Sequence, residues 1–109
     1  MGDDGQEWPA SIRAFEWDEQ KRQVNLRTHR IDFGDAQKVI DEPIFIRRSD
    51  REGEARFVVY GFLEAREVVV ICTFRGERCR VISARRARRD ERRKYHSRLS
   101  RRPEAEERD

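Results

Sequence analysis

The stretch EVVVICTFRGERCRVI, residues 67–82, decides the fold. Its first part, residues 67–75, is rich in Val and Ile and is typical of a central strand that is buried on both faces. Gly76-Glu77 then predicts a two-residue hairpin turn, with Gly at the first position as a type II′ turn prefers. Residues 78–82 therefore return as an antiparallel strand, and the turn sets the register by pairing Arg75 with Arg78 and, further back, Ile71 with Ile82.

The predicted hairpin separates two kinds of side chain, because successive residues of a strand point to opposite faces. One face carries the core residues Cys72, Phe74, Cys79 and Val81. The other face carries Thr73, Arg75, Arg78 and Arg80. Like charges that face each other across a strand pair are destabilising. Either nearby acids (Glu54, Glu77 or Glu91) or a bound phosphate must therefore neutralise these arginines, and the pattern leaves both open.

The sequence on either side of the hairpin predicts three helices and two further strands. Asp18 caps a helix over residues 19–29, and Asp32 caps a second helix that Pro43 ends. Strands are expected over residues 44–47 and 56–63, with Phe15–Trp17 as a short strand or an entry segment. A last helix is expected to start near Ser83 or Ala84 and to end near His96. The order of elements predicts an α+β domain with two N-terminal helices, a four-stranded antiparallel sheet and one C-terminal helix.

Composition limits the domain organisation and the partners. Charged residues make up 43 % of the 109 residues, and the apolar residues gather in the middle of the chain. We therefore expect a leader at residues 1–11, one domain at residues 12–96 and a charged tail at residues 97–109. Ten basic and only two acidic residues lie between Arg85 and Arg102. That segregation favours a polyanionic partner, namely RNA, DNA or an acidic protein segment, over a membrane surface.

Targeting signals and cysteine usage favour the cytoplasm. The chain has no apolar run near 18 residues and no signal-peptide pattern at its N-terminus. Two cysteines are too few for a disulfide scaffold, although Cys72 and Cys79 share a face and are close enough for a disulfide to be conceivable. Two cysteines and two distant histidines do not support a metal site, and neither a P-loop nor an HExxH motif occurs. No cofactor is expected.

The start of the last helix is a second candidate for anion binding. If Ser83 is its N-cap, Arg85 and Arg86 fall in the first turn, where free N–H groups and the helix dipole attract an anion. Glu91 and Tyr95 follow one helical turn apart on the same helix. They either hold the helix on the sheet or face the basic site, and the sequence does not decide between these roles.

Lys21, Asn25 and His29 recur at four-residue steps and therefore share one face of the first helix. They either line the basic site or form hydrogen bonds to the sheet and loops. Histidine is the side chain that most readily exchanges a proton near neutral pH, so His29 is a candidate general acid or base.

Three segments resemble the BrnT family of toxins. The run FEWDEQKRQVNLRTHRIDFGDAQKVIDEP is similar to the BrnT opening, with Lys, Asn and His at four-residue steps. EARFVVYGF resembles its second strand, and VVVICTFRGERCRVISARRARRDERRKY resembles its closing motif, with an Ile-Ser-Ala-Arg block. The resemblance spans Phe15 to Tyr95. The leader and the arginine-rich tail are less typical of the family.

The resemblance implies a RelE-like fold and an endoribonuclease toxin that halts translation. It also implies a BrnA-like ribbon-helix-helix antitoxin, with operator DNA bound only through the toxin–antitoxin complex. The matching positions are Lys21, Asn25, His29, Arg56, Thr73, Arg75, Arg80, Ser83, Arg85, Arg86, Glu91 and Tyr95. We expect a metal-independent attack of the RNA 2′-hydroxyl on the adjacent phosphate, which leaves a 2′,3′-cyclic phosphate.

In that hypothesis the site residues divide into two sets. In the catalytic set, the phosphate is held by four arginines: Arg75, Arg80, Arg85 and Arg86. Protons are moved by His29, Glu54, Glu91 or Tyr95. The RNA-binding set comprises Lys21, Asn25, Arg56, Thr73, Arg78 and Ser83. Two rival interpretations remain: a non-catalytic RNA- or DNA-binding module, and an interaction protein whose basic helix docks an acidic partner.

Overall fold

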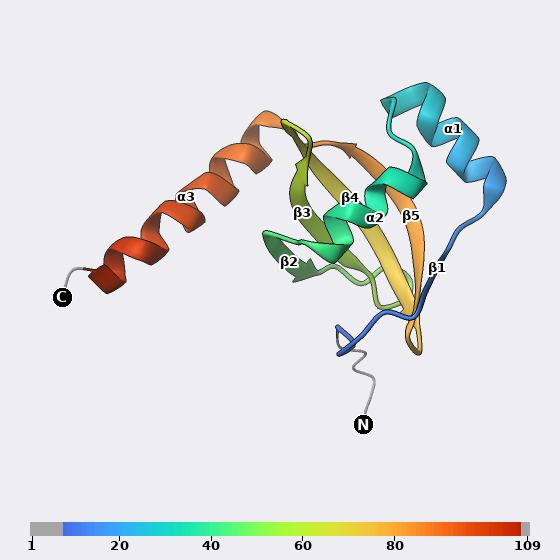
Figure 1. Cartoon of the computed structure of the whole chain (residues 1–109), viewed down its shortest axis with the longest axis horizontal. Helices are drawn as coiled ribbons and strands as arrows, with labels where there is room; N and C mark the ends of the chain where they lie inside the picture. Colours follow the sequence, from blue (N-terminus) through green and yellow to red (C-terminus); the bar gives the residue numbers. More distant parts are fainter. Residues whose placement is uncertain (1–7, 108–109) are drawn as a thin grey trace.

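Five strands form one mixed sheet at the centre of the computed structural model, which describes residues 8–107 and the side chains of residues 8–98 (Figure 1). The strand order across the sheet is β1-β5-β4-β3-β2. Along the chain the elements are β1 (Ala14–Glu16), α1 (Glu19–His29), α2 (Phe33–Asp41), β2 (Phe45–Arg48), β3 (Phe57–Leu63), β4 (Arg66–Arg75), β5 (Arg78–Arg86) and α3 (Arg89–Glu107). No helix in this part of the chain is both long and apolar enough to cross a membrane.

The predicted α+β class is confirmed, but the sheet has one more strand than predicted. β1 lies parallel to β5 and pairs Phe15 with Cys79. Phe15 packs against the main core, and this burial holds a three-residue strand in place. The sheet is therefore mixed rather than purely antiparallel, and Phe15–Trp17 is mainly a strand.

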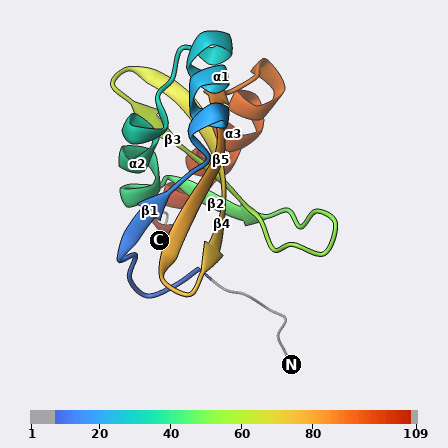
Figure 2. The same ribbon diagram turned by 90° about the vertical axis from the view of Figure 1, so that its right-hand side faces the viewer.

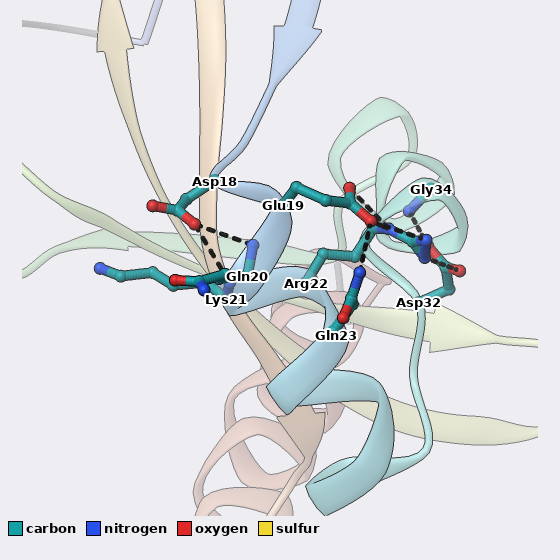
Figure 3. Close-up of polar contacts among 8 residues, drawn as sticks. All are labelled: Asp18, Glu19, Gln20, Lys21, Arg22, Gln23, Asp32 and Gly34. Carbon is teal, nitrogen blue, oxygen red and sulfur yellow. Dashed lines mark hydrogen bonds and ion pairs between the residues drawn. The ribbon is translucent and has the colours of Figure 1, made fainter.

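The two N-terminal helices begin where their caps predict (Figure 3). The Asp18 carboxylate accepts hydrogen bonds from the backbone N–H groups of Gln20 and Lys21, at 2.9 and 3.2 Å. The Asp32 carboxylate caps α2 by accepting from Gly34 N–H at 2.8 Å, and it also pairs with Arg22 of α1 at 2.9 Å. Each cap satisfies a backbone donor that the helix leaves free, and the ion pair links the two helices.

The register of the central hairpin is confirmed close to its turn and wrong further away. Arg75 pairs with Arg78, and the predicted pairing continues to Cys72 with Val81. Ile71 then pairs with Ser83 rather than Ile82, because a β-bulge adds one residue to β5 at this point. Beyond the bulge β5 continues to Arg86, since the valines of β4 need a partner strand along their whole length.

The last helix consequently begins later than predicted. α3 starts at Arg89, not near Ser83 or Ala84, and it runs beyond His96 to Glu107. Figure 1 shows that it projects away from the sheet after its first turns.

The two faces of the sheet are covered unequally. α2 packs on one face, where the main core includes Phe33, Val39 and Val70. The second face carries a smaller cluster in which Tyr95 of α3 packs against Val58 and Tyr60. Figure 2 shows α3 and the loop between β2 and β3 on the side of the sheet away from α2. α3 and this loop cover part of the second face, where Thr73 is buried. Arg75 and Arg78 on the same face are exposed and Arg80 is half-buried, so these arginines can meet a ligand.

Candidate arginine-lined site on the sheet

The uncovered part of the second face carries most of the predicted arginines. The hairpin register places Thr73 opposite Arg80 and Arg75 opposite Arg78 on this face. The core-facing residues Cys72, Phe74, Cys79 and Val81 are buried on the other face, as predicted. We call the face that carries the arginines, including its continuation along β5, the arginine face. Its residues are Thr73, Arg75, Arg78, Arg80, Ser83 and Arg85.

The bulge decides which later residues join the arginine face. Without the bulge at Ile82, strict alternation from Arg80 would put Arg86 on the same face as Arg80. With it, Ser83 and Arg85 are on that face, while Ala84 is buried in the main core. Arg86 pairs with Val68, whose side chain belongs to the main core, so Arg86 is on the opposite face. The prediction that Arg85 and Arg86 bind an anion together in the first turn of a helix is therefore wrong.

Two arginines of the arginine face share one carboxylate, which the sequence analysis did not identify. Glu16 of β1 pairs in register with Arg80 of β5. Its Oε1 lies 2.5 Å from Arg78 Nη2, and its Oε2 lies 3.4 Å from Arg80 Nη1. The hydrogen bond from Arg78 keeps the pKa of the Glu16 carboxyl below its usual value. We call Glu16, Arg78 and Arg80 the exposed clasp, because 62 % of the Arg78 side chain is accessible.

Arg85 is held by a second carboxylate at the other end of the face. Both of its terminal nitrogens lie 2.8 Å from the two carboxylate oxygens of Glu91. Glu91 also accepts the backbone N–H of Arg88 at 2.8 Å, which caps the start of α3 as a capping-box acid does. The Arg85 hydrogen bond is the main cause that lowers the pKa of Glu91 to about 2. Only 18 % of the Arg85 side chain and 16 % of the Glu91 side chain are accessible, so we call this pair the buried clasp.

Tyr95, a predicted proton carrier, is a core residue. Its ring lies between Tyr60 and Phe45, with centroid distances of 4.3 and 4.9 Å, and its side chain is 2 % exposed. Tyr95 therefore anchors α3 on the sheet. Beside it, Glu67 accepts a hydrogen bond from the Tyr60 hydroxyl and lies 3.0 Å from His96 Nε2.

The polar stripe of α1 has two parts. Asn25 is buried, and its amide binds the backbone of β5 by donating to Ala84 O at 2.8 Å and accepting from Ala84 N at 3.1 Å. It also donates to Ile31 O at 3.0 Å, so both of its amide protons are engaged. Lys21 and His29 are exposed and line a hollow of about 620 Å³ that reaches β5 at Ile82. Ile82 is next to Ser83 along β5, but none of the residues that define the arginine face lines this hollow.

Of the remaining predicted residues, Arg56 lies at the end of the β2–β3 loop, and Thr73 and Arg75 are on β4. Arg56 pairs with Glu54 at 2.8 Å, and the Thr73 hydroxyl donates to Ala55 O at 2.7 Å. These contacts hold the end of the loop against the arginine face. Arg75 is exposed and has no carboxylate partner among residues 8–98.

The cysteines and acids of the described region do not form a further reactive cluster. Cys72 and Cys79 are both buried free thiols. The Cys72 thiol donates a hydrogen bond to Cys79, and this bond together with burial raises the pKa of Cys72 far above its usual value, as is typical of an unreactive structural cysteine. Over the part of the chain that the structure describes, no three His, Cys, Asp or Glu side chains gather as metal ligands would.

Comparisons with known proteins identify relatives of the chain. The model for the family described as ribonuclease toxin, BrnT, of type II toxin–antitoxin system matches residues 17–91. That range contains every predicted site residue except Tyr95. The fold is similar to the 1.1 Å crystal structure of the Brucella abortus ribonuclease toxin, BrnT, with a TM-score of 0.56 and 27 % identity over 70 % of this chain and 97 % of that chain. Among curated protein sequences, none matches the chain.

Proposed function

Because the chain belongs to the BrnT family of ribonuclease toxins of type II toxin–antitoxin systems, we propose that it cleaves RNA on the arginine face without a metal ion. The observation that supports this most directly is the gathering of Arg75, Arg78 and Arg80 on an uncovered sheet face. Arginine presents a planar pair of donors that matches two phosphate oxygens. These three residues hold the scissile phosphate and neutralise the charge that develops on it.

Both the nucleophile and the leaving group of the proposed reaction belong to the RNA. The 2′-oxygen attacks the adjacent phosphorus, and the bond between phosphorus and the 5′-oxygen breaks. A base takes the proton of the 2′-hydroxyl, and an acid protonates the departing 5′-oxygen. The products are a 2′,3′-cyclic phosphate and a 5′-hydroxyl end.

Of the predicted proton carriers, His29 is the one we retain. Glu91 is committed to the buried clasp, Tyr95 is buried, and Glu54 pairs with Arg56. His29 is exposed and lines, together with Lys21, the hollow that reaches β5 at Ile82. We assign proton transfer to His29 and phosphate contact to Lys21, while Asn25 positions the helix that carries both. Arg85 shapes the site through its clasp, and Arg86 makes no contact with the RNA.

The family also gives the toxin an antitoxin partner. We propose that the partner is a BrnA-like ribbon-helix-helix protein that covers the arginine face in the cytoplasm and binds operator DNA within the complex. Growth arrest on expression of the chain, relieved by co-expression of the neighbouring gene, supports this assignment. Growth arrest without such relief contradicts it.

The decisive experiment maps the ends produced from naked RNA in the presence of EDTA. Wild-type protein is expected to leave 5′-hydroxyl and cyclic phosphate ends. Arg80→Ala removes one donor to the developing charge and is expected to lower the rate by about 10²–10³-fold. Lys38→Ala, which removes a positive charge from α2 on the far side of the sheet, is the matched control and retains the wild-type rate.

Each part of the proposal fails on a different outcome. Loss of cleavage in EDTA, with recovery on adding Mg²⁺, contradicts the metal-independent chemistry. Equal rates for Arg80→Ala and wild type contradict the placement of the site. Salt-dependent binding of RNA with no cleavage under any condition favours the rival, a non-catalytic binding module.

A further inference from the structure

We propose that the Glu16 carboxylate occupies, in the free protein, the position between Arg78 and Arg80 that a phosphate of bound RNA takes. Glu16 is then an internal competitor that sets the affinity of the arginine face for RNA. This inference rests on the proposed function, because it assumes that RNA binds at Arg78 and Arg80.

The geometry of the exposed clasp imitates a bound phosphate. Glu16 does not chelate one guanidinium; it contacts two arginines through separate oxygens, Oε1 to Arg78 and Oε2 to Arg80. A phosphate that bridges the same two arginines presents two oxygens in the same way. The carboxylate reaches this position because β1 runs parallel to β5 and places Glu16 beside Arg80.

The exposed clasp can open without disturbing the core. The accessible fractions are 62 % for the Arg78 side chain, 32 % for Arg80 and 21 % for Glu16. Arg78 is thus exposed while Arg80 and Glu16 are half-buried, and an ion pair whose arginine is exposed to water contributes little to stability. No backbone N–H donates to the Glu16 side chain among the described hydrogen bonds, in contrast to Glu91. An incoming phosphate therefore has to displace only two charge-assisted contacts, and it re-forms both with its own oxygens.

An alternative role for Glu16 is that of the general base, and the same contacts argue against it. Hydrogen bonds from two arginines stabilise the ionised carboxylate and lower its pKa. A carboxylate held in this way is a weak proton acceptor. A competitor and a base also differ in the sign of their mutational effect, because removing a competitor strengthens binding whereas removing a base slows the reaction.

The test measures binding of a short 2′-O-methyl RNA, which lacks the attacking hydroxyl, to Glu16→Gln. We expect this variant to bind about tenfold more tightly than wild type at low salt, because a like charge beside the phosphate is removed. The difference should shrink as salt increases. Glu19→Gln is the matched control: Glu19 also pairs with an arginine, Arg22, but it is on α1. It should change the affinity much less than Glu16→Gln.

Unchanged or weaker binding by Glu16→Gln overturns the inference, and so does an equal gain in Glu19→Gln. Unchanged binding together with a large loss of turnover on cleavable RNA assigns Glu16 as the base instead. If thermal melting shows that Glu16→Gln does not fold, Glu16→Ala provides the same comparison. The proposed function fails separately, because it depends on Arg80→Ala and on cleavage, whereas this binding test requires no cleavage.

Discussion

The two clasps at opposite ends of the arginine face use the same chemistry with different surroundings. The two carboxylates are similarly covered, with 21 % of Glu16 and 16 % of Glu91 accessible. The arginines differ much more, since 62 % of Arg78 but only 18 % of Arg85 is accessible. Glu91 also caps α3 by accepting a backbone N–H. An arginine–glutamate pair is thus structural where it is buried and shares a backbone group, and exchangeable where its arginines meet water.

The largest stability effect that separates the clasps is expected for Glu91→Gln. The change removes the negative charge from a paired, mostly buried carboxylate that also caps α3. We expect a loss of about 1.5–3 kcal/mol in the free energy of unfolding, the usual contribution of a hydrogen bond to a charged group. Urea denaturation measures this loss, with Glu16→Gln as the matched variant. Equal losses in the two variants contradict the distinction between buried and exposed clasps.

Asn25→Ala tests a polar link that carries no charge. Removing the amide leaves the backbone N–H and C=O of Ala84 and the C=O of Ile31 without their partner. We expect a loss of about 1–3 kcal/mol in the free energy of unfolding. This loss should be the same at low and high salt because no ion pair is involved. Chemical denaturation with urea at two salt concentrations provides the measurement. A loss that falls steeply with salt contradicts this account of Asn25.

The smallest difference in the free energy of unfolding is expected between wild type and Glu91→Gln in strong acid. The pKa of Glu91 is about 2, below its ordinary value of 4.5, so its ionised form stabilises the folded state. That stabilisation is fully present above pH 4.5 and is lost as the pH falls towards 2. Wild type and variant should therefore converge in stability over this window, as followed by denaturation at pH 6, 4 and 3. A gap that stays constant down to pH 3 shows that Glu91 acts through packing rather than charge.

The sequence predicts local structure well because its signals act over a few residues. The caps at Asp18 and Asp32 and the turn at Gly76-Glu77 each specify the backbone next to them, and the pairing from Arg75 to Cys72 follows from the turn. The bulge at Ile82 has no such local signal. This one extra residue puts Arg85 on the arginine face and Arg86 on the opposite face. Independently of the bulge, β5 continues through the predicted helix start to Arg86.

The contacts that the sequence did not reveal join distant segments. Glu16 and Arg80 are 64 positions apart, and nothing in a three-residue strand indicates which neighbour it will pair with. Asn25 lies 59 positions from Ala84. A hydrogen bond from the stripe of Lys21, Asn25 and His29 to the sheet was one of two alternatives, but the sequence did not indicate which of the three residues forms it or which strand residue is the partner. The candidate site was thus predictable where it lies on the hairpin, and not where β1 and α1 complete it.

The bond between Asn25 and Ala84 also covers backbone groups at an edge of the sheet. β1 pairs with β5 only at Arg78–Arg80, so the outer side of β5 beyond this point has no strand beside it. An unpaired strand of this kind is a template for another chain, which can add its own strand and begin an aggregate. The Asn25 amide occupies the N–H and C=O of Ala84 that an incoming strand would need at this position. A single helix side chain thereby replaces a neighbouring strand at the edge of the sheet.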